Sequence, residues 1–275
     1  MSKAAFADIR MEAYKSFFDH AWAKYILDLV DATKLDQPVF DLCAAWRGAA
    51  NTHLLPWLLA TQVQSAIEMR VDTSEPFGKK WVSLVRDRLV SAMGDSLRHM
   101  QRKRLQEALD KLFYEIDAVP SRDAASPDGE EMWRELFQNS EFRFAILGSQ
   151  RMCYASVYYA YEDFLARCVG LARRESHYRM PRRAQFEKHF QDALGEPLCS
   201  LCWTDTKVNQ ARLARHALVH NGGRVTHELK SEGHPFEVCD GEIQVMASNT
   251  SDLFHVLKDR ATTLTKACIR HPNIT

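Results

Sequence analysis

The sequence has 275 residues, 46% of them hydrophobic, with 36 basic and 36 acidic residues. The hydrophobic share supports a packed core and excludes general disorder, and the net charge of zero excludes a protein coated in basic charge, such as a histone. The 11 glycines and 9 prolines are few, since these two residues make up about 12% of an average chain. We therefore expect a mostly helical protein.

The first part of the chain, from about 4 to 117, has apolar residues at helical spacing and predicts four or five packed helices. Phe17 to Val30 is one such run and Trp81 to Met93 is another, with expected breaks at 36–38 and 73–78. No motif in this region indicates a particular chemistry.

The best candidate for a linker is 121–130, which is rich in turn-forming residues and lacks apolar periodicity. It predicts an N-terminal helical region of unknown role over 1–120 and a second domain over 131–275. A long loop inside one continuous helical domain is the alternative.

The second domain begins with a long helical stretch over 131–173, with a break near Asn139. A shorter helix follows Pro181, which suits a first-turn position, and the next helix spans 205–221 and ends at two glycines. The apolar face of the long stretch is made of Tyr154, Val157, Tyr161, Phe164, Cys168 and Leu171.

Near the C-terminus the apolar period changes from helical spacing to two. Asp240 and Gly241 favour the type I′ turn of a hairpin, which pairs Val238 with Ile243. A last helix is expected over 251–269, with Ser251 as its cap. The sequence thus predicts an all-α helical bundle with one small β-hairpin near the C-terminus and an N-terminal helical region.

Arg215 and His220 lie five positions apart at the end of a predicted helix, and Asn221 with two glycines then turns the chain away. Cationic residues are favoured at any helix C-terminus by the macrodipole, so the pair alone has a purely structural explanation. Together with the apolar residues between them and the Asn-Gly-Gly stop, the segment resembles the signature of the HEPN superfamily of all-helical ribonucleases and nucleotide-binding domains. His216 stands where that signature often has asparagine, which is a departure from it.

This resemblance extends from about Glu141 to the C-terminus. It implies a metal-independent endoribonuclease of a bacterial toxin or phage-defence branch, which acts on transfer or messenger RNA and needs no cofactor. It also implies a homodimer and an antitoxin or regulatory partner. A non-catalytic RNA- or nucleotide-binding module and a protein-interaction scaffold are the alternatives.

The two motif residues suit that chemistry. Histidine, with an unperturbed pKa of about 6.5, can deprotonate a ribose 2′-OH near neutral pH, and arginine offers a fixed charge and a forked donor to the phosphate. At about 100° per residue, Arg215 and His220 lie roughly 140° apart around the helix axis. A two-fold dimer would bring two copies of each into one cleft.

Three further residues are supporting candidates. Glu162 on the long helix would orient Arg215 or His220 if it faces inward, although an exposed position on that helix is equally compatible. His216 is a candidate second proton-transfer group, and Asn221 is a candidate for holding the turn or contacting the phosphate.

A basic run over 171–190 holds six basic and two acidic residues. Tyr178 and Phe186 are interleaved with it, and such aromatics suit the unpaired bases of RNA. A solvated charged face is the alternative. The candidate RNA-binding residues are Arg173, Arg174, Arg179, Arg182 and Arg183.

Cys199 and Cys202 have the spacing of half a zinc site, but a second matching pair is missing, so no metal is expected. The seven cysteines are an odd number, and the sequence has neither a signal peptide nor an apolar stretch of about 18 residues. We therefore expect reduced thiols in a cytoplasmic protein without a membrane span.

Overall fold

The computed structural model describes residues 11–72, 103, 106–111 and 129–274. The chain divides into two compact units. The smaller unit consists of Met1–Ser16 and Asn51–Gln150, and the larger unit of Phe17–Ala50 and Arg151–Thr275. The larger unit therefore combines the region around the Arg215 motif with residues 17–50, which the sequence analysis assigned to the N-terminal region.

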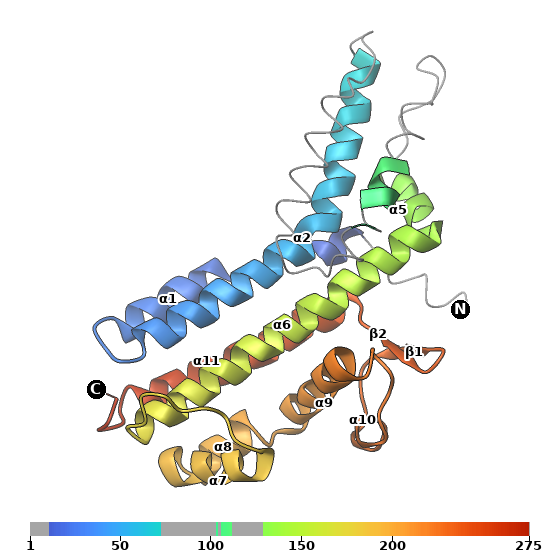
Figure 1. Cartoon of the computed structure of the whole chain (residues 1–275). Coiled ribbons are helices and arrows are strands. Elements are labelled where there is room, and N and C mark those ends of the chain that lie inside the picture. The colour runs from blue at the N-terminus through green and yellow to red at the C-terminus, as the bar shows by residue number, and fades with distance from the viewer. Residues whose placement is uncertain (1–10, 73–102, 104–105, 112–128, 275) are drawn as a thin grey trace. The chain divides into compact units, whose positions relative to one another are not determined.

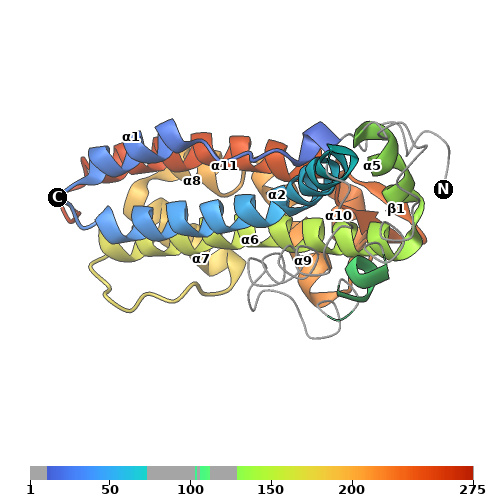
Figure 2. The same ribbon diagram turned by 90° about the horizontal axis from the view of Figure 1, so that it is seen from above.

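The larger unit is built from α-helices in layers. Figures 1 and 2 show α1, α2 as far as Ala50, α6 from Arg151 and α11 side by side, with α7, α8 and α9 on the other side of α6 and α11. The helices are α1 (His20–Val30), α2 (Asp36–Asp72), α6 (Ser140–Ala172), α7 (Arg183–Leu194), α8 (Glu196–Cys202), α9 (Thr206–His220), α10 (His227–Glu232) and α11 (Ala247–Cys268).

Aromatic side chains hold these layers together. The ring of Trp46 lies 5.5 Å from that of Trp22 and 5.2 Å from that of Phe254, which joins α2, α1 and α11. The indole N–H of Trp46 donates to the carbonyl of Val157 at 2.9 Å, and the Tyr161 hydroxyl donates to the carbonyl of Cys202 at 2.7 Å. All six of these residues are buried in the core, so the polar ends of Trp46 and Tyr161 are satisfied inside it.

The apolar face predicted for the long helix is confirmed, because every member is buried except Leu171, which is partly buried. The predicted break also lies where expected: α5 (Gly129–Gln138) ends before Asn139 and α6 begins after it. The side chain of Asn139 accepts hydrogen bonds from the backbone N–H groups of Glu141 and Phe142 and so caps α6.

The smaller unit contains the 3-10 turn η2 (Met11–Tyr14), the later part of α2, α5 and the start of α6. Tyr14 and Trp133 pack edge to face at 5.3 Å, and the buried His53 bonds to Gln150 at 2.8 Å. Most of the other helices predicted before residue 120, the Trp81 to Met93 helix among them, and most of the 121–130 linker lie outside the described residues.

The C-terminal hairpin forms with the predicted register. β1 (Glu237–Cys239) pairs antiparallel with β2 (Glu242–Gln244), and Val238 is opposite Ile243. Asp240 and Gly241 both have positive φ, 51° and 79°, as a type I′ turn requires. The fold is therefore all-α with one small two-stranded hairpin.

Three predicted boundaries were wrong by a few residues. α11 begins at Ala247 rather than Ser251, because the side chain of Asn249 accepts the backbone N–H of Met246 and starts the helix earlier. Residues 36–38 form the first turn of α2 instead of a break. Pro181 precedes α7, whose N-cap is Arg182, and does not lie in its first turn.

Among the described residues, no helix combines the length and apolar character needed to cross a lipid bilayer.

Candidate functional site

Helix α9 carries the Arg215 motif, and its local sequence explains its bounds. The side chain of Asp205 accepts the backbone N–H groups of Lys207 and Val208, which caps the first turn. The buried face of the helix includes three small residues, which allow close packing. These are Ala211, Ala214 and Ala217.

The predicted glycine stop ends α9. Gly222 and Gly223 have φ values of +64° and +89°, which side chains with a Cβ rarely adopt. The N–H groups of Asn221 and Gly223 both donate to the carbonyl of Ala217, at 3.1 and 2.9 Å. A Cβ on Gly223 would lie 3.2 Å from the Arg151 guanidinium, so the turn is also sterically confined. The last residues of α9 are thus held in one position.

Glu162 of α6 lies beside Arg215. Of the two positions that the sequence allowed for Glu162, exposed or facing inward, it has the inward one. An oxygen of the Glu162 carboxylate is 3.7 Å from Nη2 of Arg215, and only 17% of the Glu162 side chain is exposed. Burial raises the pKa of this carboxyl group, while the positive charges of Arg215 and Arg212 oppose the rise. The contact is longer than a hydrogen bond, so Glu162 holds the guanidinium loosely.

Two more residues of α6 and α9 share this environment. Tyr158 is wholly buried, and its hydroxyl has no hydrogen-bond partner among the described residues. Burial and the charge of Glu162 raise its pKa, whereas Arg212 and Arg215 lower it. Burial also lowers the pKa of Arg212, and the nearby charge of Arg183 acts in the same direction. The negative charges of Glu162 and Glu232 act on Arg212 in the opposite direction. The region therefore holds three arginines against two carboxylates, and its excess positive charge suits an anion.

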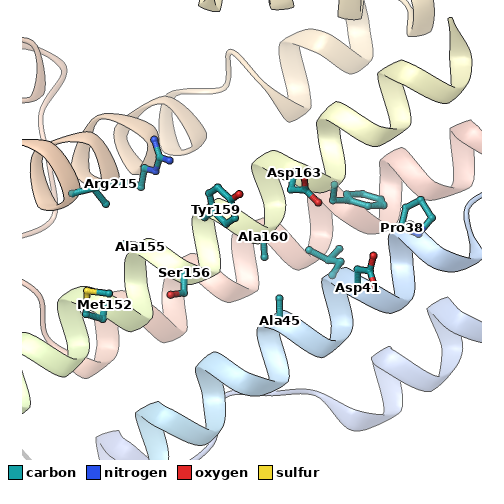
Figure 3. Close-up of a pocket in the computed structure, with 13 residues that line it drawn as sticks. Pro38, Asp41, Ala45, Met152, Ala155, Ser156, Tyr159, Ala160, Asp163 and Arg215 are labelled. Atoms are coloured by element: carbon teal, nitrogen blue, oxygen red, sulfur yellow. The ribbon is translucent and has the colours of Figure 1, made fainter. Parts of the chain in front are cut away.

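Arg215 also borders a hollow in the larger unit, shown in Figure 3. The hollow has a volume of about 520 Å³ and lies between α2, α6 and α9. Its wall is mostly apolar and includes Ala45, Ala155 and Val219. The guanidinium of Arg215 lies 5.8 Å from the centre of the Tyr159 ring, which also lines the hollow. Beyond Tyr159 and Glu162, Arg215 forms no hydrogen bond or ion pair with the described residues.

His220 and His216 form a pair on an exposed side of α9. Their ring centres are 4.9 Å apart, and both residues are exposed. Nothing in the described part of the chain links His220 to Arg215 by a hydrogen bond, ion pair or ring contact. Asn221, the C-cap of α9, is exposed next to His220 and borders a second hollow with Arg224 and Glu242. One chain thus presents the imidazoles and the guanidinium as two separate groups.

Comparisons of the chain with protein-family models, curated proteins and solved structures gave no match. The case for the site therefore depends on the residues and their geometry. In chemical terms, the end of α9 offers two solvent-accessible imidazoles for proton transfer and one guanidinium with free donors for an anion.

The arginines of the basic run have different surroundings. Arg173 pairs with Glu175 at 2.8 Å, and Arg174 donates to the side chain of Asn273 at 2.8 Å, so both make contacts within the fold. Arg179, Arg182 and Arg183 are exposed. Of these, Arg183 is near enough to Arg212 to affect its pKa, which places one end of the run beside the Arg215 site.

The two aromatics of the basic run both make contacts within the fold. Phe186 is completely buried and packs against Trp203, with ring centres 4.7 Å apart. Tyr178 is hydrogen-bonded to His189 at 3.0 Å and lies beside Phe186. Phe186 is on the core face of α7, so it does not offer the stacking surface for RNA bases that the sequence pattern suggested.

Cys199 and Cys202 both lie on α8 and are buried. Their thiols contact the carbonyls of Glu187 and Arg260, and burial raises the pKa of Cys202 to about 12. All seven cysteines are free. Among the described residues, no group of three or more His, Cys, Asp or Glu side chains is arranged to hold a metal ion.

The sequence analysis missed two residues of the site, Tyr159 and Arg212. Arg212 is one helical turn before Arg215, and that spacing was a usable signal. Tyr159 falls outside the buried stripe of α6, and 59% of it is exposed. A large aromatic residue at a position that the helical pattern predicts to be exposed was the signal for it.

Proposed function

We propose that this chain is a metal-independent endoribonuclease, in which His220 transfers protons and Arg215 binds the scissile phosphate. The observation that carries the proposal is the incomplete bonding of Arg215. It meets one carboxylate at 3.7 Å and keeps donors free, on the same helix as two exposed imidazoles. A guanidinium in a positive environment with unused donors suits a phosphodiester.

The reaction needs two proton transfers and no outside reactant. An imidazole removes the proton of the ribose 2′-OH, the 2′-oxygen forms a bond to phosphorus, and the bond from phosphorus to the 5′-oxygen breaks. A second group protonates the leaving 5′-oxygen, which gives a 2′,3′-cyclic phosphate and a 5′-OH. We assign the first transfer to His220 and the second to His216. Arg215 neutralises the charge that develops on the phosphate.

The active site of this proposal is shared by two protomers. Arg215 faces α6 and the hollow, whereas His220 is on the exposed side of α9. A two-fold dimer that brings two α9 helices together places the imidazoles of one protomer next to the guanidinium of its partner. Mixed dimers of Arg215→Ala and His220→Ala protomers are then expected to regain activity that neither variant has alone.

In biological terms, we propose a cytoplasmic toxin or phage-defence effector that cleaves transfer or messenger RNA and is controlled by an antitoxin or another regulatory partner. The resemblance of the Arg215 motif supports this setting. Growth arrest on expression of the wild-type chain, relieved by His220→Ala, is the expected result in cells.

The deciding experiment incubates purified protein and RNA with a chelator present. Wild type is expected to leave 2′,3′-cyclic phosphate ends, and His220→Ala to lose about 100- to 10,000-fold in rate. His255→Ala is the matched control, because His255 is also an exposed helical histidine of the larger unit. RNA binding by both proteins without cleavage would replace the nuclease with a binding module, and a magnesium requirement would exclude the metal-free mechanism.

A further inference from the structure

The hollow beside Arg215 has the size and lining of a site for a small ligand. Its volume of about 520 Å³ falls in the range of about 300–1,000 Å³ that is usual for such sites. Its wall is mostly apolar, with a few polar groups such as the Ser156 hydroxyl. The carboxylates at one end, Asp41 and Asp163, share Arg167 as their ion-pair partner, which offsets one of their two negative charges.

Tyr159 gives the hollow an open aromatic surface. It lines the hollow and is 59% exposed. The guanidinium of Arg215 lies 5.8 Å from its ring centre, which leaves other parts of the ring in contact with solvent. An exposed ring next to a cation is the arrangement on which the bases of single-stranded nucleic acids stack.

We propose that this hollow binds an unpaired nucleobase, with Tyr159 as the stacking surface, next to the phosphate that Arg215 contacts. The inference rests on the RNA substrate of the proposed function and adds a requirement for single strands. A base in a duplex is stacked and paired, so it cannot enter the hollow without being turned out of the helix. Stacking uses the flat aromatic face, which all four bases have, so little preference among the bases is expected.

Charge favours a nucleotide over an apolar peptide or a second copy of this chain. The apolar wall ends at Arg215, and the positive charges of Arg212 and Arg183 follow it. A nucleotide has both parts at the right spacing, because its apolar base is joined through the ribose to an anionic phosphate. A purely apolar occupant would bury the open donors of Arg215 without a partner, which costs free energy.

A matched pair of exposed tyrosines allows a sharp test. Tyr25 on α1 is 47% exposed and has Lys266 5.6 Å from its ring centre, but it does not line the hollow. The probe is a fluorescent single-stranded oligoadenylate, and its binding is measured by anisotropy in the His220→Ala background, where its cleavage is expected to be slow. Tyr159→Ala is expected to weaken binding roughly 5- to 150-fold. Tyr159→Phe keeps the ring and is expected to bind like the background protein, as is Tyr25→Ala.

A ligand without bases shows whether Tyr159→Ala weakens binding through lost stacking or through a damaged fold of the variant. A strand of the same length with abasic nucleotides lacks the bases that would stack on Tyr159. It is therefore expected to bind equally to the His220→Ala protein and to the same protein with Tyr159→Ala. The same RNA in a duplex is expected to bind weakly to both.

The outcomes separate this inference from the nuclease proposal. Base-dependent binding that needs Tyr159, without cleavage by the wild type, keeps the subsite and rejects the nuclease. Cleavage and binding that are unchanged in Tyr159→Ala reject the subsite and keep the nuclease. If Tyr159→Ala bound RNA unchanged but sedimented as a monomer where the background protein is a dimer, the hollow would be assigned to a second copy of the chain. If neither protein bound RNA, both proposals would be rejected.

Discussion

Two arginines near the same hollow, Arg167 and Arg215, have very different bonding. Arg167 forms ion pairs with two carboxylates: Nη1 contacts Asp41 of α2, and Nε contacts Asp163 of α6 at 2.8 Å. Among the carboxylates of the described residues, Arg215 pairs with Glu162 alone, at 3.7 Å, and it lies against the ring of Tyr159. Both side chains are partly exposed, 40% for Arg167 and 23% for Arg215, so burial does not explain the difference.

The difference shows how an arginine with a structural role can be told from one available to a ligand. A guanidinium has five N–H donors in a fixed fork, and two carboxylates on different helices use several of them. Arg167 therefore links α2 to α6, and an incoming anion would have to compete with two negative charges. Arg215 has one distant carboxylate and a further positive charge nearby, so an anion meets less competition there.

The largest expected effect is on cleavage, in Arg215→Ala. Loss of a charged donor to the developing phosphate charge is expected to reduce the rate of RNA cleavage by about 100- to 1,000-fold. The unfolding midpoint is expected to change little near pH 4.5 and to fall at higher pH, where the buried Glu162 carboxylate has lost one of the positive charges that stabilise it. Arg215→Lys keeps the charge without the fork and is expected to have intermediate activity. Equal cleavage by the alanine variant and wild type would show that Arg215 does not contact the phosphate.

A smaller effect, on stability instead of cleavage, is expected for Arg167→Ala. The variant removes two ion pairs and leaves Asp41 and Asp163 as neighbouring like charges. Because these groups are partly exposed, solvent screens them, and a loss of about 1 kcal/mol in the free energy of unfolding is expected. Urea denaturation at matched ionic strength measures it. If Arg167→Ala instead abolished cleavage at unchanged stability, the distinction between the two arginines would fail.

Local patterns allowed much of the fold to be predicted from the sequence. The bounds of α9 follow from Asp205 and the two glycines, the break before α6 from Asn139, and the hairpin register from the Asp-Gly turn. Each of these depends on residues close together in the chain, where capping and turn preferences decide the conformation.

Features that depend on distant parts of the chain could not be predicted in this way. Glu162 and Arg215 are 53 positions apart, and nothing local decides which side of α6 faces α9. The burial of Phe186 depends on Trp203, a residue of another segment. The grouping of residues 17–50 with the motif depends on contacts such as that of Trp46 with Val157. Tertiary packing decides all three features, and for Phe186 it overrides the local pattern of basic residues.

The smallest expected effect concerns the one carboxylate that Arg215 does have. Burial holds the pKa of Glu162 in the folded chain above the ordinary value of 4.5, which applies to the unfolded chain. Between the unfolded and the folded pKa, the folded chain therefore binds more protons than the unfolded chain. Its contribution to stability is therefore greatest at low pH and declines as the pH rises through this window.

Glu162→Gln removes this titration. The free energy of unfolding of the variant minus that of wild type is expected to increase as the pH rises above 4.5 and then to level off, which denaturation at a series of pH values measures. Arg215→Ala makes the comparison sharper, because it removes a positive charge that opposes the rise in pKa. Its own loss of stability with rising pH is expected to extend to higher pH than that of wild type. A difference that decreases as the pH rises would mean that the arginines outweigh burial, and that Arg215 is held by Glu162 as firmly as Arg167 is held by its two partners.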